Sequence, residues 1–426
     1  MNKNIKLAVA GAVLALSASA AQAGIIIPAG DWTLDVSGNV NTFATWTRAT
    51  GAGATIVGGI AGGNDTGSRT ASNITTGLLP NYLAVSGSTR QNDLDVAFTI
   101  SINPGSSTTQ SLKQSPQQEN RQAFLTFGDK SWGSIKIGKD LGVFASDAIL
   151  NDMTLLGVGS GAGALAGNTT TLGRIGSGFL YADWKSQIAY TTPNFNGFQA
   201  TAALTQAWNQ QNLSGRTWHN VDSNGRAGAQ TAYEGKASYS FANDAMTGKL
   251  WVSGIYQKVK GLSAFGVDED GRFSRDATVE DTSMYAGDIG LNLNVANFGL
   301  TGYYYAGTGM GTTGQGLGGF GLAHVEADPN HVIRSRDSDG GYIQATYTLP
   351  TKTKIGASWG VSNLDLANGE VNNNVVKSNE MWTIGAYHPL TKHLNLVAEF
   401  SEVNSENHQN QENTSRTGSA GAILFF

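Results

Sequence analysis

Apolar and polar residues alternate along many short segments of this chain. Over residues 32–46, from Trp32 to Trp46, the apolar side chains share one face, while Asp, Ser, Asn and Thr share the other. The same two-residue period recurs over 94–102, 233–241 and 285–293. A period of two is typical of β-strands with one apolar face and one wet face. The pattern therefore predicts an all-β protein in which helices are nearly absent.

Two kinds of connection separate these segments. The short turns lie at 91–93, 128–131, 193–197, 242–244, 294–298, 350–351 and 390–392. The long polar stretches lie at 48–76, 103–118, 139–179, 209–230, 261–281, 308–339, 363–377 and 404–415. Short turns at one end and long loops at the other are typical of outer-membrane β-barrels. Seven turns and eight loops predict about 16 strands, an even number that brings the two chain ends to the same side.

The first 23 residues have the features of a secretory signal peptide. Lys3 and Lys6 form a positive segment, residues 7–17 are apolar, and Ala21 and Ala23 supply a small–x–small cleavage site. We therefore expect residues 1–23 to be removed and 24–426 to form a single transmembrane β-barrel domain. No later segment approaches the roughly 20 consecutive apolar residues that a membrane helix needs. An exported chain of this kind is either a secreted soluble protein, such as a β-sandwich, or a membrane β-barrel.

Composition narrows this choice. The 56 glycines among 426 residues are about twice the usual share, and the charged fraction of 14% is well below the usual quarter. A chain of this kind with a mean hydropathy of −0.19 suits a barrel that faces lipid outside and water inside. The absence of cysteine excludes disulfides and thiolate metal sites. The net charge of −5 falls to −7 without the two signal lysines, which argues against a nucleic-acid partner.

Four passages carry a resemblance to a known family. Residues 121–128 followed by 132–139 resemble the strand–turn–strand signature of Gram-negative general porins. Residues 185–193 resemble the strand after the constriction loop of that family, and 387–393 resemble its late hairpin. Residues 422–426 end in an aromatic residue, as the family's assembly signal does. The passages occur in the family's order, so the resemblance covers the whole mature chain.

The resemblance implies a closed antiparallel barrel of about 16 strands, usually a homotrimer, whose third external loop folds into the lumen. Here that loop is 139–179, and its start, 144–153, is predicted to form a short helix. In the family, acidic residues on this loop face basic residues on the opposite wall. By position, Asp147 and Asp152 match the acidic side, and Arg121 matches one basic position.

Two features depart from the family pattern. Tyr82 stands on the second strand, where the family often has a basic residue. The alternation around Arg121 is also ambiguous, because the apolar Leu125 shares its parity. The basic side of the constriction is therefore expected to carry fewer charges. The alternative for each candidate charge is an ordinary solvated residue of the lumen or of a loop. The candidate substitutes on the basic side are Lys136, Lys185 and Arg174.

These observations predict an outer-membrane porin that forms a water-filled channel for passive diffusion of small hydrophilic solutes and ions. The alternative is a barrel-based outer-membrane enzyme or adhesin that acts through its external loops; stepwise conductance in a planar bilayer separates the two. No catalytic residue or cofactor is expected, since the histidines show no metal spacing and no nucleophile motif is found. The expected partners are two further copies of the chain, outer-membrane lipid, and the barrel assembly machinery, which would recognise Phe426.

Charges at the narrowest point of such a channel set a transverse field that selects solutes. With Tyr82 in place of a basic residue, we expect a modest cation preference. In this reading Asp147 or Asp152 faces the lumen and is opposed by Arg121 and Lys185. The letters of 309–314 match GxGxxG, but no helix follows, so a flexible external loop is expected there rather than a phosphate site.

Overall fold

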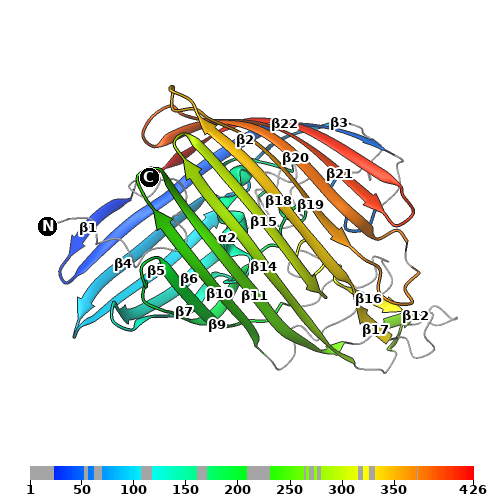
Figure 1. The fold of residues 1–426 in the computed structure, drawn as a ribbon, viewed down its shortest axis with the longest axis horizontal. Coiled ribbons are helices and arrows are strands. Elements are labelled where there is room, and N and C mark those ends of the chain that lie inside the picture. The colour runs from blue at the N-terminus through cyan, green and yellow to red at the C-terminus, as the bar shows by residue number, and fades with distance from the viewer. Residues whose placement is uncertain are drawn as a thin grey trace.

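The protein folds as a closed antiparallel β-barrel (Figure 1). The computed structural model describes residues 24–51, 56–61, 70–106, 118–160, 170–208, 231–262, 265–267, 273–275, 280–314, 320–325, 332–371 and 373–426. These contain an 18-stranded sheet, of which 16 strands make the barrel wall. The wall strands are β2 (Trp32–Gly51), β4 (Tyr82–Gln91), β5 (Leu94–Pro104), β6 (Gln118–Asp129), β7 (Gly133–Leu141), β8 (Trp184–Thr191), β9 (Phe198–Thr205), β10 (Ala232–Ala242), β11 (Met246–Leu262), β14 (Glu280–Val295), β15 (Phe298–Thr308), β18 (Asp337–Thr348), β19 (Lys354–Leu364), β20 (Val376–Pro389), β21 (Leu394–Asn407) and β22 (Glu412–Phe425).

The remaining strands are accessory. β1 (Ile25–Ala29) and β3 (Thr70–Thr75) both pair with β2, on opposite edges. Two small hairpins, β12 (Phe265–Val267) with β13 (Phe273–Arg275) and β16 (Leu322–Val325) with β17 (Val332–Ser335), belong to the long connections. The barrel closes where β22 pairs with β2. At this seam Phe426 and Gly38 exchange two backbone hydrogen bonds of 3.0 and 2.8 Å.

The strand count and the turns agree with the sequence-based prediction. Each of the seven predicted short turns joins two consecutive wall strands at the same end of the barrel. Several predicted loops contain strand, and 404–415 differs most from the prediction. The stretch 404–415 is mostly strand, because β21 continues to Asn407 and β22 begins at Glu412. Polar side chains in this stretch are compatible with a strand as well as with a loop, because successive side chains of a strand point to opposite faces of the sheet.

Alternation along the strands separates a lipid-suited outside from a polar inside. On β18, Ile343 is 63% exposed on the outer face while its neighbour Tyr342 is 1% exposed inside. Large apolar side chains repeat on the outside around the wall, as at Ile188, Leu250 and Leu300. An outward apolar band of this kind suits contact with lipid.

The connection between β7 and β8 folds into the barrel. We call residues 142–183 the inner loop; its described parts are 142–160 and 170–183. It contains α2 (Ser146–Asn151) and the 3₁₀ helix η1 (Met153–Leu156), and Figure 1 shows α2 among the strands. The predicted helix within 144–153 is therefore confirmed. In the described part of the chain, no helix has the length and apolar character needed to cross a membrane.

A β-bulge determines which way Arg121 points. Ser101 of β5 pairs with Gln122 of β6, whereas Asn103 pairs with Glu119, so β6 carries one extra residue in this interval. An extra residue reverses the parity of the strand on one side of the bulge. Leu125 consequently faces outward, while Arg121 is buried inside. The ambiguity of the sequence pattern at Arg121 has this physical cause.

The glycine-rich segment 309–314 lies in a long connection, as expected, but it is packed and buried rather than exposed. Met310 and Thr312 are fully buried, and the Thr313 carbonyl accepts a hydrogen bond of 3.1 Å from the backbone N–H of Tyr181 in the inner loop. Gly309 and Gly314 have φ values of 79° and 82°, which favour glycine. The glycines therefore serve tight turns that pack this segment against the inner loop.

Candidate functional site

The inner loop is attached to the barrel wall at several points, and the first is Glu234 of β10. One carboxylate oxygen accepts hydrogen bonds from the backbone N–H groups of Val143 and Phe144, at 2.7 and 2.8 Å. The other accepts from Lys185 at 2.7 Å and from Thr205 at 2.8 Å. The carboxylate is fully buried, and its four hydrogen bonds use the capacity of both oxygens. It fixes the start of the loop.

Glu399 of β21 makes a second attachment of the same kind. Its carboxylate accepts from the N–H groups of Val158 and Gly159 at 2.7 and 2.8 Å, and from the Tyr387 hydroxyl at 2.6 Å. Gly157 is needed beside it, because a Cβ there would lie 2.1 Å from a Glu399 carboxylate oxygen. Wall carboxylates thus bind backbone at two separate places along the loop.

Gln344 and Tyr342 of β18 hold the middle of the inner loop. The Gln344 side chain accepts from the N–H of Met153 at 2.6 Å and donates to the carbonyl of Asn151 at 3.1 Å. The Tyr342 hydroxyl donates to the carbonyl of Ala148 at 2.8 Å. Together they satisfy backbone groups at the end of α2 and the start of η1 that would otherwise lack partners.

Asp147 of α2 lies between two lysines of the wall. Its carboxylate is 2.9 Å from the Lys236 ammonium of β10 and also pairs with Lys249 of β11. Burial alone would raise the pKa of Asp147, but the charges and hydrogen bonds of the two lysines lower it below its ordinary value. Asp147 is therefore a carboxylate that stays ionised although it is nearly inaccessible.

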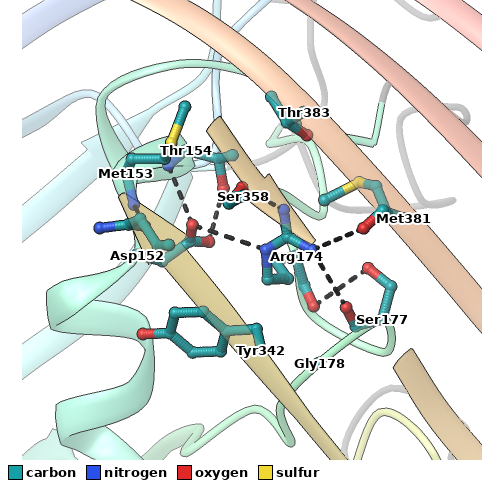
Figure 2. Close-up of polar contacts among 12 residues, drawn as sticks. Asp152, Met153, Thr154, Arg174, Ser177, Gly178, Tyr342, Ser358, Met381 and Thr383 are labelled. Carbon is teal, nitrogen blue, oxygen red and sulfur yellow. Dashed lines mark hydrogen bonds and ion pairs between the residues drawn. The ribbon is translucent and has the colours of Figure 1, made fainter. Parts of the chain in front are cut away.

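Asp152 and Arg174 form a fully buried group within the inner loop (Figure 2). Asp152 caps η1, accepting from the N–H and hydroxyl of Thr154 at 3.0 and 2.5 Å, and lies 3.9 Å from the Arg174 guanidinium. Arg174 also donates to the Met381 carbonyl at 2.9 Å and to the Ser358 hydroxyl. Arg174 thus joins the far end of the loop to β19 and β20.

The other predicted residues fall in different places. Arg121 pairs with Glu119 at 2.7 Å, and its guanidinium carbon lies 5.9 Å from the centre of the Trp184 ring. Lys136 pairs with Asp140 of its own strand. Lys185 is buried against Glu234. The expected opposition of Asp147 by Arg121 and Lys185 was wrong, because the loop path brings Asp147 to β10 and β11 instead.

A cavity lies on the other side of the inner loop, between it and strands β4 to β8. Tyr82 and Arg121 both line it, so the structure brings these two predicted residues together. Much of the rest of its lining is apolar. Leu150 of the inner loop lines it as well.

Sequence reasoning missed most of the attachment points. Glu234 and Lys236 lie on the polar face of the alternating segment 233–241, but nothing in the sequence singles them out among other inward polar residues. Inward charged residues on strands were the available signal for Glu234, Lys249 and Glu399. Within the described ranges, no group of three or more metal-ligating side chains could hold a metal ion.

Comparisons with known proteins bear on this arrangement. A family model described as Gram-negative porin matches residues 8–408. The structure resembles the outer membrane channel DcaP of Acinetobacter baumannii, with a TM-score of 0.66 at 14% identity over 95% of this chain and 100% of that one. It resembles an anion-selective porin from Comamonas acidovorans, with a TM-score of 0.55 at 12% identity over 93% and 100%. It also resembles the trimer form of in-vitro folded OmpT from Vibrio cholerae, with a TM-score of 0.53 at 13% identity over 93% and 99%. A comparison with curated protein sequences found no match.

Proposed function

This chain belongs to the Gram-negative porin family, and we propose that its solutes cross the barrel between the inner loop and strands β4 to β8. The protein is an outer-membrane channel for passive diffusion of small solutes, as its sequence predicted. The short turns then lie on the periplasmic side and the long loops outside.

The observation that carries the proposal is that wall side chains hold the inner loop from one side of the barrel, whereas next to β4 it is joined through backbone, by Leu78 N–H to the Gly157 carbonyl at 2.8 Å and Thr171 N–H to the Gly77 carbonyl at 3.2 Å. Glu234, Lys249, Gln344 and Glu399 hold it from β10, β11, β18 and β21. The cavity lies on the opposite side, where Tyr82 and Arg121 face the loop across it. Because side chains of one wall hold the loop against that wall, the space for passage lies beside the opposite wall. Tyr82 and Arg121 are thus the wall side of the constriction.

Cysteine blocking tests this route, because the natural chain contains no cysteine. In Leu150→Cys the new thiol lies on the cavity side of the loop, and reaction with a charged methanethiosulfonate reagent adds bulk there. We expect the stepwise conductance in a planar bilayer to fall after reaction. The control is Thr351→Cys in the exposed short turn between β18 and β19, which should react without any change in conductance.

Two outcomes count against the proposal in different ways. If Leu150→Cys is fully modified by mass spectrometry yet conducts as before, the route lies elsewhere. If the unmodified protein forms no channel at all, the diffusion function itself is contradicted. An enzyme or adhesin acting through the external loops would then take its place.

We also propose that the chain forms a homotrimer in outer-membrane lipid. Its support is the family, together with the trimer form of the OmpT relative. The outward apolar band accounts for the lipid contact. Light scattering of the detergent-extracted protein should give three copies per particle before heating. A single copy under the same conditions would contradict the trimer.

Export and assembly complete the proposal. Cleavage after Ala23 is expected from the sequence, although residues 1–23 lie outside the described residues. N-terminal sequencing of the membrane protein should begin at Gly24, and an intact Met1 would contradict it. Recognition of Phe426 by the barrel assembly machinery is proposed on the family resemblance.

A further inference from the structure

The cavity between the inner loop and strands β4 to β8 has an apolar side. Eight of its eighteen described lining residues are leucine or isoleucine, and most of these belong to the inner loop or to the segment before β4. Leu150 of the inner loop is only partly buried. The lumen of a porin is usually polar and filled with water. Apolar surface inside it is stabilised when another apolar group, rather than water, covers it.

Two polar side chains of β5 face the same cavity without partners. Ser101 and Asn103 are 3% and 5% exposed, and both line the cavity. Within the described chain, the Ser101 hydroxyl and the Asn103 side-chain oxygen have no hydrogen-bond partner, whereas the Asn103 amide donates to the Asn81 carbonyl at 3.2 Å. Buried polar atoms without a partner are rare and call for a group that supplies the missing bond. The two atoms lie on the inward face of one strand and give the cavity a polar edge.

The lining of the cavity does not carry an unpaired charge. Arg121 is the one charged residue among its described lining residues, and it is paired with Glu119 at 2.7 Å. Asp183 and Asp35 lie nearby, but neither lines the cavity. The contacts that the cavity offers a solute are therefore hydrogen bonds and apolar packing rather than attraction to a net charge.

The polar edge specifies part of the chemistry of a ligand. An amide oxygen only accepts hydrogen bonds, so the group that faces Asn103 has to donate an N–H or an O–H. The Ser101 hydroxyl can both donate and accept. Across the cavity, Leu150 and Leu155 of the inner loop offer apolar contact. Sites for small molecules typically combine a mostly apolar lining with a few placed polar groups in this way.

We infer that this cavity is a binding subsite for small amphipathic solutes without net charge, which carry an N–H or O–H donor at one end and an apolar group at the other. The donor end bonds to Asn103 and Ser101, and the apolar group packs against Leu150 and Leu155. The inference rests on the diffusion route proposed above and names its solute class. In a pore that selects by size alone, an apolar group gives a solute no advantage, whereas here it covers apolar surface in the route.

Protection of a cysteine from modification tests the subsite. The probes are free leucine and free asparagine, which have nearly the same shape and the same charges but differ in the polarity of the side group. In Leu150→Cys, mass spectrometry follows the rate of reaction with a charged methanethiosulfonate reagent, with either probe at equal concentration. We expect leucine to slow the reaction in a saturable manner and asparagine to slow it much less. Thr351→Cys in the exposed short turn should react at one rate with either probe.

Variants of the polar edge, each made in the Leu150→Cys chain, locate the bound donor. Ser101→Ala and Asn103→Leu should each raise the half-protecting concentration of leucine by about 2- to 10-fold, which corresponds to one hydrogen bond. Asn103→Asp also loses the bond to the Asn81 carbonyl but keeps acceptor oxygens, so leucine should protect it at least as well as the parent. Asn292→Leu makes the same change on β14, away from the cavity, and should leave protection as in the parent.

The outcomes separate this inference from the proposed function, because the readout is mass rather than current. Equal protection by leucine and asparagine would overturn the solute class. Protection that survives both Ser101→Ala and Asn103→Leu would overturn the role of the polar edge. No protection by leucine in a protein that conducts would show that only water meets these groups, and would overturn the subsite alone. Absence of any conductance would instead contradict the proposed function.

Discussion

Replacing Glu399 by alanine should release one attachment of the inner loop. The Glu399 carboxylate accepts hydrogen bonds from the N–H groups of Val158 and Gly159 at 2.7 and 2.8 Å. Both bonds lie inside the barrel, with Glu399 only 6% exposed. Alanine has no acceptor, so both N–H groups would lose their partner. Glutamine would keep one acceptor oxygen but not the charge.

The structure gives the size of the effect. Hydrogen bonds to a charged group contribute about 1.5–3 kcal/mol each, so two of them contribute about 3–6 kcal/mol. At about 1.4 kcal/mol per tenfold change, the local opening equilibrium should rise by about 10²- to 10⁴-fold. Water that enters the space left by the side chain would reduce this value. The glutamine variant should fall between the parent and the alanine variant.

Hydrogen–deuterium exchange with mass spectrometry measures this opening. Peptides that contain Val158 and Gly159 should exchange faster in Glu399→Ala by the stated factor. Peptides around Val143, which Glu234 holds, should exchange as in the parent. The control is Ser401→Ala on the same face of the same strand, where the lost bond goes to Thr383 of the wall, at 2.9 Å. Unchanged exchange at Val158 and Gly159 in Glu399→Ala would refute the attachment.

Three further predictions concern the same structure. Gly157→Ala should accelerate exchange of the same peptides, because its Cβ would displace the Glu399 carboxylate; exchange equal to the parent would show that the loop accommodates the methyl group. Deleting Phe426 should lower the amount of heat-modifiable barrel in membranes, since two hydrogen bonds to Gly38 close the seam; equal amounts at equal expression would contradict this. The lowered pKa of Asp147 means that its carboxylate stays charged until the pH falls below the ordinary value of about 3.9. The ion pairs of Asp147 with Lys236 and Lys249 should therefore persist between about pH 7 and pH 5, so hydrogen exchange of peptides that cover α2, corrected for the intrinsic rate, should be equal at both pH values, and faster exchange at pH 5 that is absent from Asp147→Asn would contradict it.

Much of the barrel could be predicted from the sequence, because the two-residue period depends only on neighbouring residues within one strand. A two-residue period places Ile343 outside and Tyr342 inside whatever the rest of the chain does. Turn residues between such segments set the strand count, and the seven predicted turns were confirmed. The short helix at 146–151 was also within reach, since it interrupts the period inside the third long connection.

The candidate site was less predictable. Arg121 shares the sequence parity of an outward residue, and only the bulge between β5 and β6 turns it inward. Asp147 was correctly placed on the inner loop, but Lys236 and Lys249 were not identified as its partners. Those partners are distant in sequence and depend on where the loop lies across the barrel.

The barrel, its strand number and the division of residues between inside and outside follow from the sequence, because each depends on neighbours along one strand. Which inward charges face water depends on the tertiary structure. Asp140 and Lys136 are both inward by parity, yet only the lysine is accessible. The odd or even position of a residue in a strand fixes the face of the sheet on which its side chain lies, but not what covers that face. The path of the inner loop, held by Glu234 and Glu399, determines that: Lys185 and Arg174 are buried beside it, whereas Lys236 and Lys249 stay partly exposed.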